Sequence, residues 1–251
     1  MKSLIFVTEI SESMTKKIKK GRGQQEHAHD LLENPEAIAT GLGRGETFLK
    51  ENARVVAGII GVVVLVIAGI LFFQIHKANQ NEKAQAEMFQ AVYYFEQDSV
   101  ELALNGDGVN PGFLEIIDNY GGTDASNLSS FYVGSIYLSQ GDFQNAVDFL
   151  TEFSSDDFFV QAKAYSLIGD AYMELDNTGE AINFYQKAVD YKENEFFTPM
   201  YLSKLAIALE EAGQIDKAIE AYARIENEYF ESYEFTAARK HKARLEGLAA
   251  N

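Results

Sequence analysis

Residues 134–150 read GSIYLSQGDFQNAVDFL, and two later segments repeat the same order of small and aromatic residues. In this copy Gly134 is followed by a second glycine at Gly141 and by Ala146. The matching alanines of the next two copies are Ala181 and Ala218, at successive spacings of 35 and 37 residues. A period of this length predicts helix pairs that stack, because each pair alone leaves an apolar face uncovered.

The residues at the aligned positions allow the two helices of a pair to pack closely. Small residues let the helices approach each other, and aromatic residues fill the space beside them. The positions are Gly134, Tyr137, Gly141, Phe143, Ala146 and Leu150 in the first copy, Tyr165, Ile168, Gly169, Tyr172, Ala181, Tyr185 and Ala188 in the second, and Leu202, Leu205, Ala206, Leu209, Gly213, Ile215, Ala218 and Tyr222 in the third.

These positions resemble the tetratricopeptide repeat (TPR), which has a small residue midway along helix A and alanine early in helix B. The resemblance covers residues 124–230 and implies three TPR-like repeats. The sequence departs from the pattern in three respects. Asp176 replaces the turn glycine of the second copy, Ile215 replaces an aromatic residue of the third, and no copy has proline in the last turn of helix B. We therefore predict an all-α fold, an α-solenoid of TPR-like helix pairs. A helical bundle without superhelical stacking is the alternative.

The segments on either side of the repeats also have helical composition. Residues 74–123 are predicted to form a stalk and a degenerate first helix pair, with a capping box from Asp98 and Glu101 starting a fresh helix near Ser99. Residues 231–251 are predicted to form a C-terminal capping helix over about 233–248. The polar side of that helix carries Arg239, Lys240, Lys242 and Arg244.

A single apolar segment precedes the stalk. Residues 55–73 read VVAGIIGVVVLVIAGILFF, 19 residues without a charged or hydrogen-bonding side chain. A helix of this length spans roughly 28 Å, which matches a bilayer core of about 30 Å. A buried core helix rarely stays apolar on every face, and 54 residues ahead of the segment argue against a cleaved signal peptide. We predict one transmembrane helix that continues as the stalk.

Charge divides the chain at this segment. Residues 1–54 have a net charge of +1 and include the cluster Lys16, Lys17, Lys19, Lys20 and Arg22, whereas residues 78–251 have a net charge of −19. Basic residues favour the cytoplasmic side, and a long acidic domain does not resist translocation. We predict a cytoplasmic, largely disordered tail at 1–54, which has too few bulky apolar residues to fold. The acidic domain is predicted not to bind nucleic acid, because it repels phosphate.

The sequence lacks the patterns that enzymes of the common classes use. There is no cysteine, and no P-loop, His-Glu-x-x-His or Gly-x-Ser-x-Gly motif occurs. Beyond His76 the only histidine is His241, so no histidine pair could form a metal site or triad in the domain. We predict protein binding and not catalysis, with no cofactor, no metal and no small-molecule substrate.

The order of the segments is similar to that of a bacterial family, the ancillary TPR proteins of the Sec translocon. The similarity rests on Phe48-Leu49-Lys50-Glu51-Asn52 directly before the span, and on Tyr120-Gly121-Gly122-Thr123 followed by Leu128 at the entry to the repeats. It implies a single-pass protein of the bacterial inner membrane with a cytoplasmic N-terminus and a periplasmic C-terminal domain. The long N-terminal tail departs from the family.

The same resemblance implies a chaperone-like role at the periplasmic exit of the translocon. The implied partners are Sec translocon subunits, a membrane-anchored periplasmic chaperone of the isomerase type, and segments of secreted client proteins. An assembly scaffold for another cell-envelope complex, with the same anchor and a different client, is the alternative.

In TPR arrays helix A of each repeat lines the concave face. The resemblance therefore predicts a partner-binding groove on this face. The nominated residues are Leu128, Phe131, Ser135, Leu138, Lys163, Ser166, Asp170, Met173, Met200, Ser203, Ile207 and Glu210. Apolar and acidic residues are interleaved in this set, which suits an extended, partly apolar and basic segment. Lys163 is the only basic member, so a clamp for a partner's terminal carboxylate is not predicted. The alternative is that several members, among them Leu128, Leu138 and Ile207, belong to the core.

The membrane segment carries small residues at helical spacing. Ala53, Ala57 and Gly61 lie at i, i+4 and i+8, and Ala68 falls near the same face. Such a face lets another membrane helix approach closely. Small residues that simply face lipid are the alternative.

Overall fold

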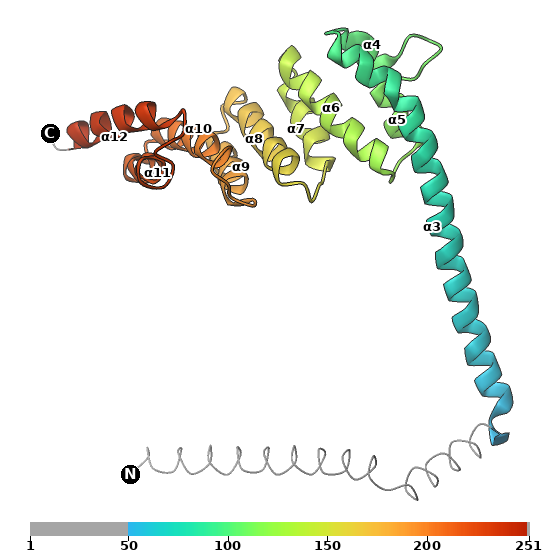
Figure 1. Ribbon diagram of the computed structural model, residues 1–251. Helices are drawn as coiled ribbons and strands as arrows, with labels where there is room; N and C mark the ends of the chain where they lie inside the picture. Colours follow the sequence, from blue (N-terminus) through green and yellow to red (C-terminus); the bar gives the residue numbers. More distant parts are fainter. Residues whose placement is uncertain (1–49, 250–251) are drawn as a thin grey trace, which may run out of the picture. The chain divides into compact units, whose positions relative to one another are not determined.

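The computed structural model describes residues 50–249, which form helices α3 to α12 and, within that range, no strand (Figure 1). The chain divides into two compact units, Met1–Phe73 and Gln74–Asn251. The predicted disordered tail lies almost wholly outside the described residues, as do Phe48 and Leu49 of the motif before the span.

Helix α3 (Ala53–Glu96) contains both the apolar segment and the predicted stalk. It is the one candidate membrane span in the described part of the chain, with a mean hydropathy of 3.1 and none of its apolar window buried. The buried residues of α3 all come later, at Ala84, Met88 and Ala91, and these pack into the second unit. A helix so apolar and so exposed in its first half is typical of a segment that lies in lipid.

Two short helices follow, α4 (Val100–Asn105) and α5 (Phe113–Asn119). The chain breaks after α3 as expected, but the predicted capping box is wrong. Ser99 and not Asp98 is the N-cap residue of α4, and its side chain makes no capping hydrogen bond. Asp98 instead adopts a left-handed conformation, with φ at 55°, and the Ser99 N–H donates to the Tyr94 carbonyl. The tight turn that closes α3 therefore determines this break, and no capping side chain contributes.

Three helix pairs and a final helix make up the rest of the domain. The pairs are α6 (Asp124–Gln140) with α7 (Phe143–Glu152), α8 (Phe158–Glu174) with α9 (Thr178–Asp190), and α10 (Thr198–Glu211) with α11 (Ile215–Glu228), followed by α12 (Phe235–Ala249). Each of these helices contacts its neighbours in the chain, with a lesser contact between α6 and α8 (Figure 1). This pattern is a solenoid and not a bundle, as predicted.

The turn inside each pair has the same backbone geometry. One residue is left-handed in every turn, with φ of 81° at Gly141, 56° at Asp176 and 70° at Gly213. The N–H groups of this residue and the next donate to carbonyls of the last turn of helix A, as in a Schellman ending. Asp176 therefore performs the role of the expected glycine, because aspartate tolerates the left-handed region better than most residues do.

The small residues bring the helices of each pair into contact, as their spacing indicated. A methyl group at Gly134 would lie 2.6 Å from Leu150 Cγ, and one at Gly169 would lie 2.6 Å from the Tyr185 ring. The helix-B alanines Ala146, Ala181 and Ala218 are fully buried.

Candidate protein-binding surface

The twelve residues of the predicted groove lie on α6, α8 and α10, the helix-A members of the three pairs. They differ in how much surface they offer to a partner. Ser166 is buried, at 1 % exposure, and Ile207 is 50 % exposed. The others are half-buried: Leu128, Phe131, Ser135, Leu138, Lys163, Asp170, Met173, Met200, Ser203 and Glu210.

The half-buried apolar members share their surface between core and solvent. Phe131 packs on the core cluster of α7 and α8, and its ring lies 5.1 Å from that of Phe153. Met173 and Met200 pack on the core of the last two pairs. Ile207 has the largest exposed fraction of the twelve, so it gives the clearest test of whether a partner touches this face.

Two acidic members of the predicted groove are held by hydrogen bonds between helices. Asp170 accepts a hydrogen bond from the Tyr185 hydroxyl at 2.7 Å and pairs with the Lys204 ammonium at 2.6 Å. These contacts join α8, α9 and α10. We call this arrangement of acid, tyrosine and cation an acid clamp.

A second acid clamp joins α10, α11 and α12. Glu210 accepts a hydrogen bond from the Tyr222 hydroxyl at 2.8 Å and forms an ion pair with Arg244. In both clamps the cation follows the acid by 34 residues. Asp170 therefore connects two consecutive helix pairs, and Glu210 connects the last pair to α12. Both acids are paired with cations of the chain itself.

Ionisation behaviour agrees with this structural role. Burial, with the adjacent Asp170 charge, raises the pKa of Tyr185 well above its ordinary value, and burial with Glu210 does the same for the pKa of Tyr222. Burial alone would raise the pKa of Glu210, but hydrogen bonds from Arg244 and Tyr222 outweigh it and leave that pKa below its ordinary value. Both tyrosines remain hydrogen-bond donors at neutral pH.

Lys204 and Arg244 were not predicted from the sequence to be partners of these acids. Arg244 was expected on the solvated side of the capping helix, yet it pairs with Glu210, and Lys242 of the same helix pairs with Glu226 at 2.7 Å. The 34-residue spacing from acid to cation was a usable signal, because it equals one TPR period. Lys163, by contrast, makes no hydrogen bond or ion pair with the described residues.

The small residues of the candidate membrane span have no partner within the described part of the first unit. Ala53, Ala57, Gly61 and Ala68 are all exposed on α3. A methyl group at Gly61 would meet no atom within 4 Å. This face is open to lipid or to another helix.

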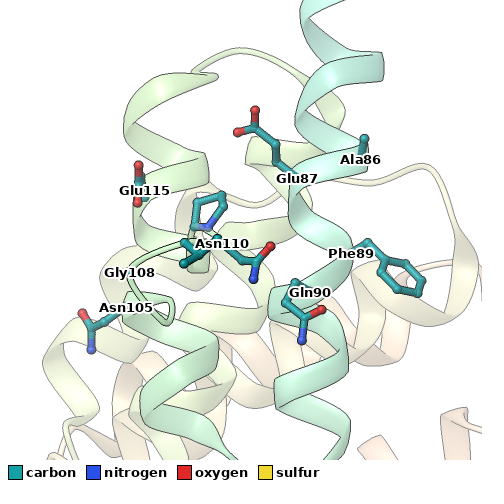
Figure 2. Close-up of a pocket in the computed structure, with 10 residues that line it drawn as sticks. Ala86, Glu87, Phe89, Gln90, Asn105, Gly108, Asn110 and Glu115 are labelled. Carbon is teal, nitrogen blue, oxygen red and sulfur yellow. The ribbon is translucent and has the colours of Figure 1, made fainter.

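An open cavity of about 550 Å³ lies between the last part of α3, the loop before α5 and α5 itself (Figure 2). The loop is held by Asp107, which accepts hydrogen bonds from Tyr94, Val109 and Asn110. The Asn110 N–H and the Tyr94 hydroxyl hold the pKa of Asp107 well below its usual range. Glu87, Phe89 and Gln90 of α3 line one side of this cavity, and Asn110 and Glu115 belong to the loop and to α5 (Figure 2).

No group of three or more histidine, cysteine, aspartate or glutamate side chains within residues 50–249 is arranged to hold a metal ion.

Comparison with known proteins agrees with the repeat architecture. Residues 46–157 match a family described as a tetratricopeptide repeat-like domain, and residues 162–195 and 201–230 each match a tetratricopeptide repeat family. No curated protein matches the chain.

Two similar solved structures are of nearly identical TPR-like repeats assigned to a kinesin light chain of Podosopora anserina, one of them a variant with a single substitution. Each is 16 % identical, with a TM-score of 0.49 over 66 % of this chain, and the match covers 85 % and 86 % of the respective structure. The family matches, the recurring turn and the small-residue contacts together identify this chain as a protein with TPR-like repeat domains.

Proposed function

We propose that this chain is a membrane-anchored protein-binding scaffold, an ancillary chaperone-like subunit at the periplasmic exit of the bacterial Sec translocon. The observation that carries the proposal is α3 itself. Its first half is an uncovered apolar span, and its last turns are buried in the domain that holds the TPR-like repeats. A scaffold with this arrangement keeps its binding surface close to a membrane complex.

The proposed binding surface is the face of α6, α8 and α10. Folds of this type are typically interaction scaffolds without catalytic activity. The half-buried Phe131, Met173 and Met200 and the exposed Ile207 offer apolar surface without opening the core. An extended segment of a secreted client would bury these groups. Each Å² of apolar area removed from water would contribute about 25 cal/mol to the free energy of binding.

The proposed location follows from the charge distribution and from the resemblance in segment order. The basic tail favours the cytoplasm, and the domain of net charge −19 would lie in the periplasm. The partners would be translocon subunits, a periplasmic chaperone and secreted client segments. Recovery of another envelope complex in place of the translocon would favour the assembly-scaffold alternative.

The test is crosslinking and copurification of the full-length chain from native membranes. Ile207→Asp places a charge on the proposed face where the side chain is half exposed, so the domain should fold normally. Leu248→Asp, on α12 at 64 % exposure, is the matched control. We expect Ile207→Asp to reduce recovery of client segments about tenfold, the equivalent of roughly 1.4 kcal/mol, with Leu248→Asp unchanged.

Equal recovery of client segments with Ile207→Asp and with Leu248→Asp would contradict the proposal that the groove binds clients. Circular dichroism of each purified variant must show wild-type helicity for the comparison to hold.

A further inference from the structure

Another hollow lies where the loop between α9 and α10 meets the loop between α11 and α12, and none of its lining residues belongs to the predicted groove. It has a volume of about 520 Å³. Three aromatic side chains that line it are largely in solvent: Phe196 is 75 % exposed, Phe230 is 64 % exposed and Tyr233 is fully exposed. We call it the aromatic cleft. Exposed apolar side chains gathered in one hollow mark an interaction site more often than scattered ones do.

Hydrogen-bonded turns hold these aromatic side chains outside the core. The Asn194 side chain accepts hydrogen bonds from the Phe196 and Phe197 N–H groups, at 3.1 and 2.9 Å. Phe197 is thereby turned inward, with its ring 4.5 Å from that of Phe159, and Phe196 is left facing outward. The exposure of Phe196 thus follows from an ordered turn.

The second loop is ordered in the same way. The Ser232 N–H donates to the Tyr229 carbonyl at 2.9 Å, and the Phe235 N–H donates to the Ser232 carbonyl at 3.3 Å. Between these bonds Phe230 and Tyr233 remain outside. Both walls of the aromatic cleft are therefore preformed, which lowers the entropic cost of binding.

The charge around the aromatic cleft has one sign. Glu195, Glu231 and Glu234 line it, and their side chains make no hydrogen bond or ion pair with the described residues. A fourth glutamate, Glu228, shares Arg224 with Glu193. No lysine or arginine is among the described residues that line the cleft.

Aromatic faces are electronegative and attract lysine and arginine, and neighbouring carboxylates add to that attraction. We propose that the aromatic cleft binds a basic segment of a partner protein in which lysine or arginine alternates with apolar residues. The apolar side chains cover Phe196, Phe230 and Tyr233, and the cations pair with Glu195, Glu231 and Glu234. This surface does not include the helix-A groove, so the inference does not depend on the proposed function.

The test is fluorescence anisotropy with the full-length chain in nanodiscs. The probe is a short labelled peptide that alternates lysine with leucine and phenylalanine. Matched peptides carry glutamate in place of lysine, or serine in place of the apolar residues. We expect only the first peptide to bind, with an affinity that falls as salt increases.

Two double variants separate the contributions. Glu231→Gln with Glu234→Gln keeps the shape of the aromatic cleft and removes two charges, and Phe230→Ser with Tyr233→Ser removes exposed aromatic surface. Each should weaken binding by about 5- to 30-fold, as expected for two cation–π or charge contacts of roughly 0.5–1 kcal/mol each. Glu174→Gln with Glu220→Gln, at exposed positions elsewhere, should bind as wild type does. Ile207→Asp should also bind normally, which distinguishes this surface from the groove.

Equal binding of the glutamate peptide, or wild-type affinity in both cleft variants, would overturn the proposal. A second result would also overturn the proposal, namely self-association of the chain without peptide that the double variant Arg239→Ser with Lys240→Ser abolishes. The exposed basic residues of α12 in a second copy, and not a partner protein, would then occupy the aromatic cleft.

Discussion

Two glycines set how closely the first two helix pairs pack. At Gly134 a methyl group would approach the Leu150 backbone nitrogen at 3.0 Å and the Ala146 carbonyl oxygen at 3.1 Å. At Gly169 it would meet the Tyr185 ring, which cannot swing away freely because its hydroxyl is held by Asp170. Neither site can accept a side chain without moving its neighbour.

We therefore expect Gly134→Ala and Gly169→Ala each to lower the free energy of unfolding by about 1–3 kcal/mol, the usual cost of overpacking. The measurement is denaturation followed by circular dichroism. Gly247→Ala is the control, because a methyl group there meets nothing within 4 Å and alanine favours the helix by up to about 1 kcal/mol. Unchanged stability in the first two variants would show that the pairs are more loosely packed than the contacts indicate.

Glu210 makes the second acid clamp dependent on pH. Its pKa in the folded chain lies below that of an unfolded glutamate, about 4.3, so its stabilisation is present above pH 4.3. The stabilisation is lost as the pH falls through the lower, folded pKa. Glu210→Gln should cost about 1–2 kcal/mol at pH 7, because two interhelical contacts to a charged group are weakened.

The difference between wild type and Glu210→Gln should shrink in melts performed below pH 4. A difference that stays constant from pH 7 to pH 3 would show that the carboxylate charge does not contribute. Glu220→Gln, whose side chain is exposed on α11, is the matched control and should have little effect at either pH.

Among single elements, α3 has a testable feature, which is the exposed face formed by its small residues Ala53, Ala57, Gly61 and Ala68. Because a methyl group at Gly61 touches nothing in the described chain, a larger residue there should not disturb the packing of α3. We expect Ala57→Leu with Gly61→Leu to reduce copurification of a membrane partner severalfold without reducing membrane insertion. Val63→Leu with Ile67→Leu, on a different face, should have no effect. Unchanged copurification in the first variant would assign the contact to the stalk or the repeats.

The helices and their stacking could be predicted because the small residues Gly134, Gly169 and Ala206 recur at spacings of 35 and 37 residues. The break at Asp98 was predicted in the right place for the wrong reason, since a left-handed turn depends on backbone conformation that no residue pattern specified there. The acid clamps were not predicted, because a charged residue is expected to be solvated unless its partner on the next helix is known. The aromatic cleft lies in loops, outside the repeat pattern.

For the whole molecule, the proposed topology places the repeats and the N-terminal tail on opposite sides of the membrane. Protease added to spheroplasts should degrade residues 78–251 and spare the N-terminal tail, because the long acidic domain is predicted to be exported. The readout is a tag at each end of the chain. A C-terminal tag that survives until the membrane is lysed would show that the orientation is wrong.

We propose above all that the face of α6, α8 and α10 contacts polypeptides next to a membrane complex. The most direct measurement is photo-crosslinking from a reactive amino acid placed at Ile207 of the full-length chain in native membranes, compared with one at Leu248. Both side chains are well exposed, so reactivity is matched. The prediction is that Ile207 gives adducts with translocon subunits or secreted polypeptides and that Leu248 does not. The same adducts from both positions, or none from Ile207, would contradict it.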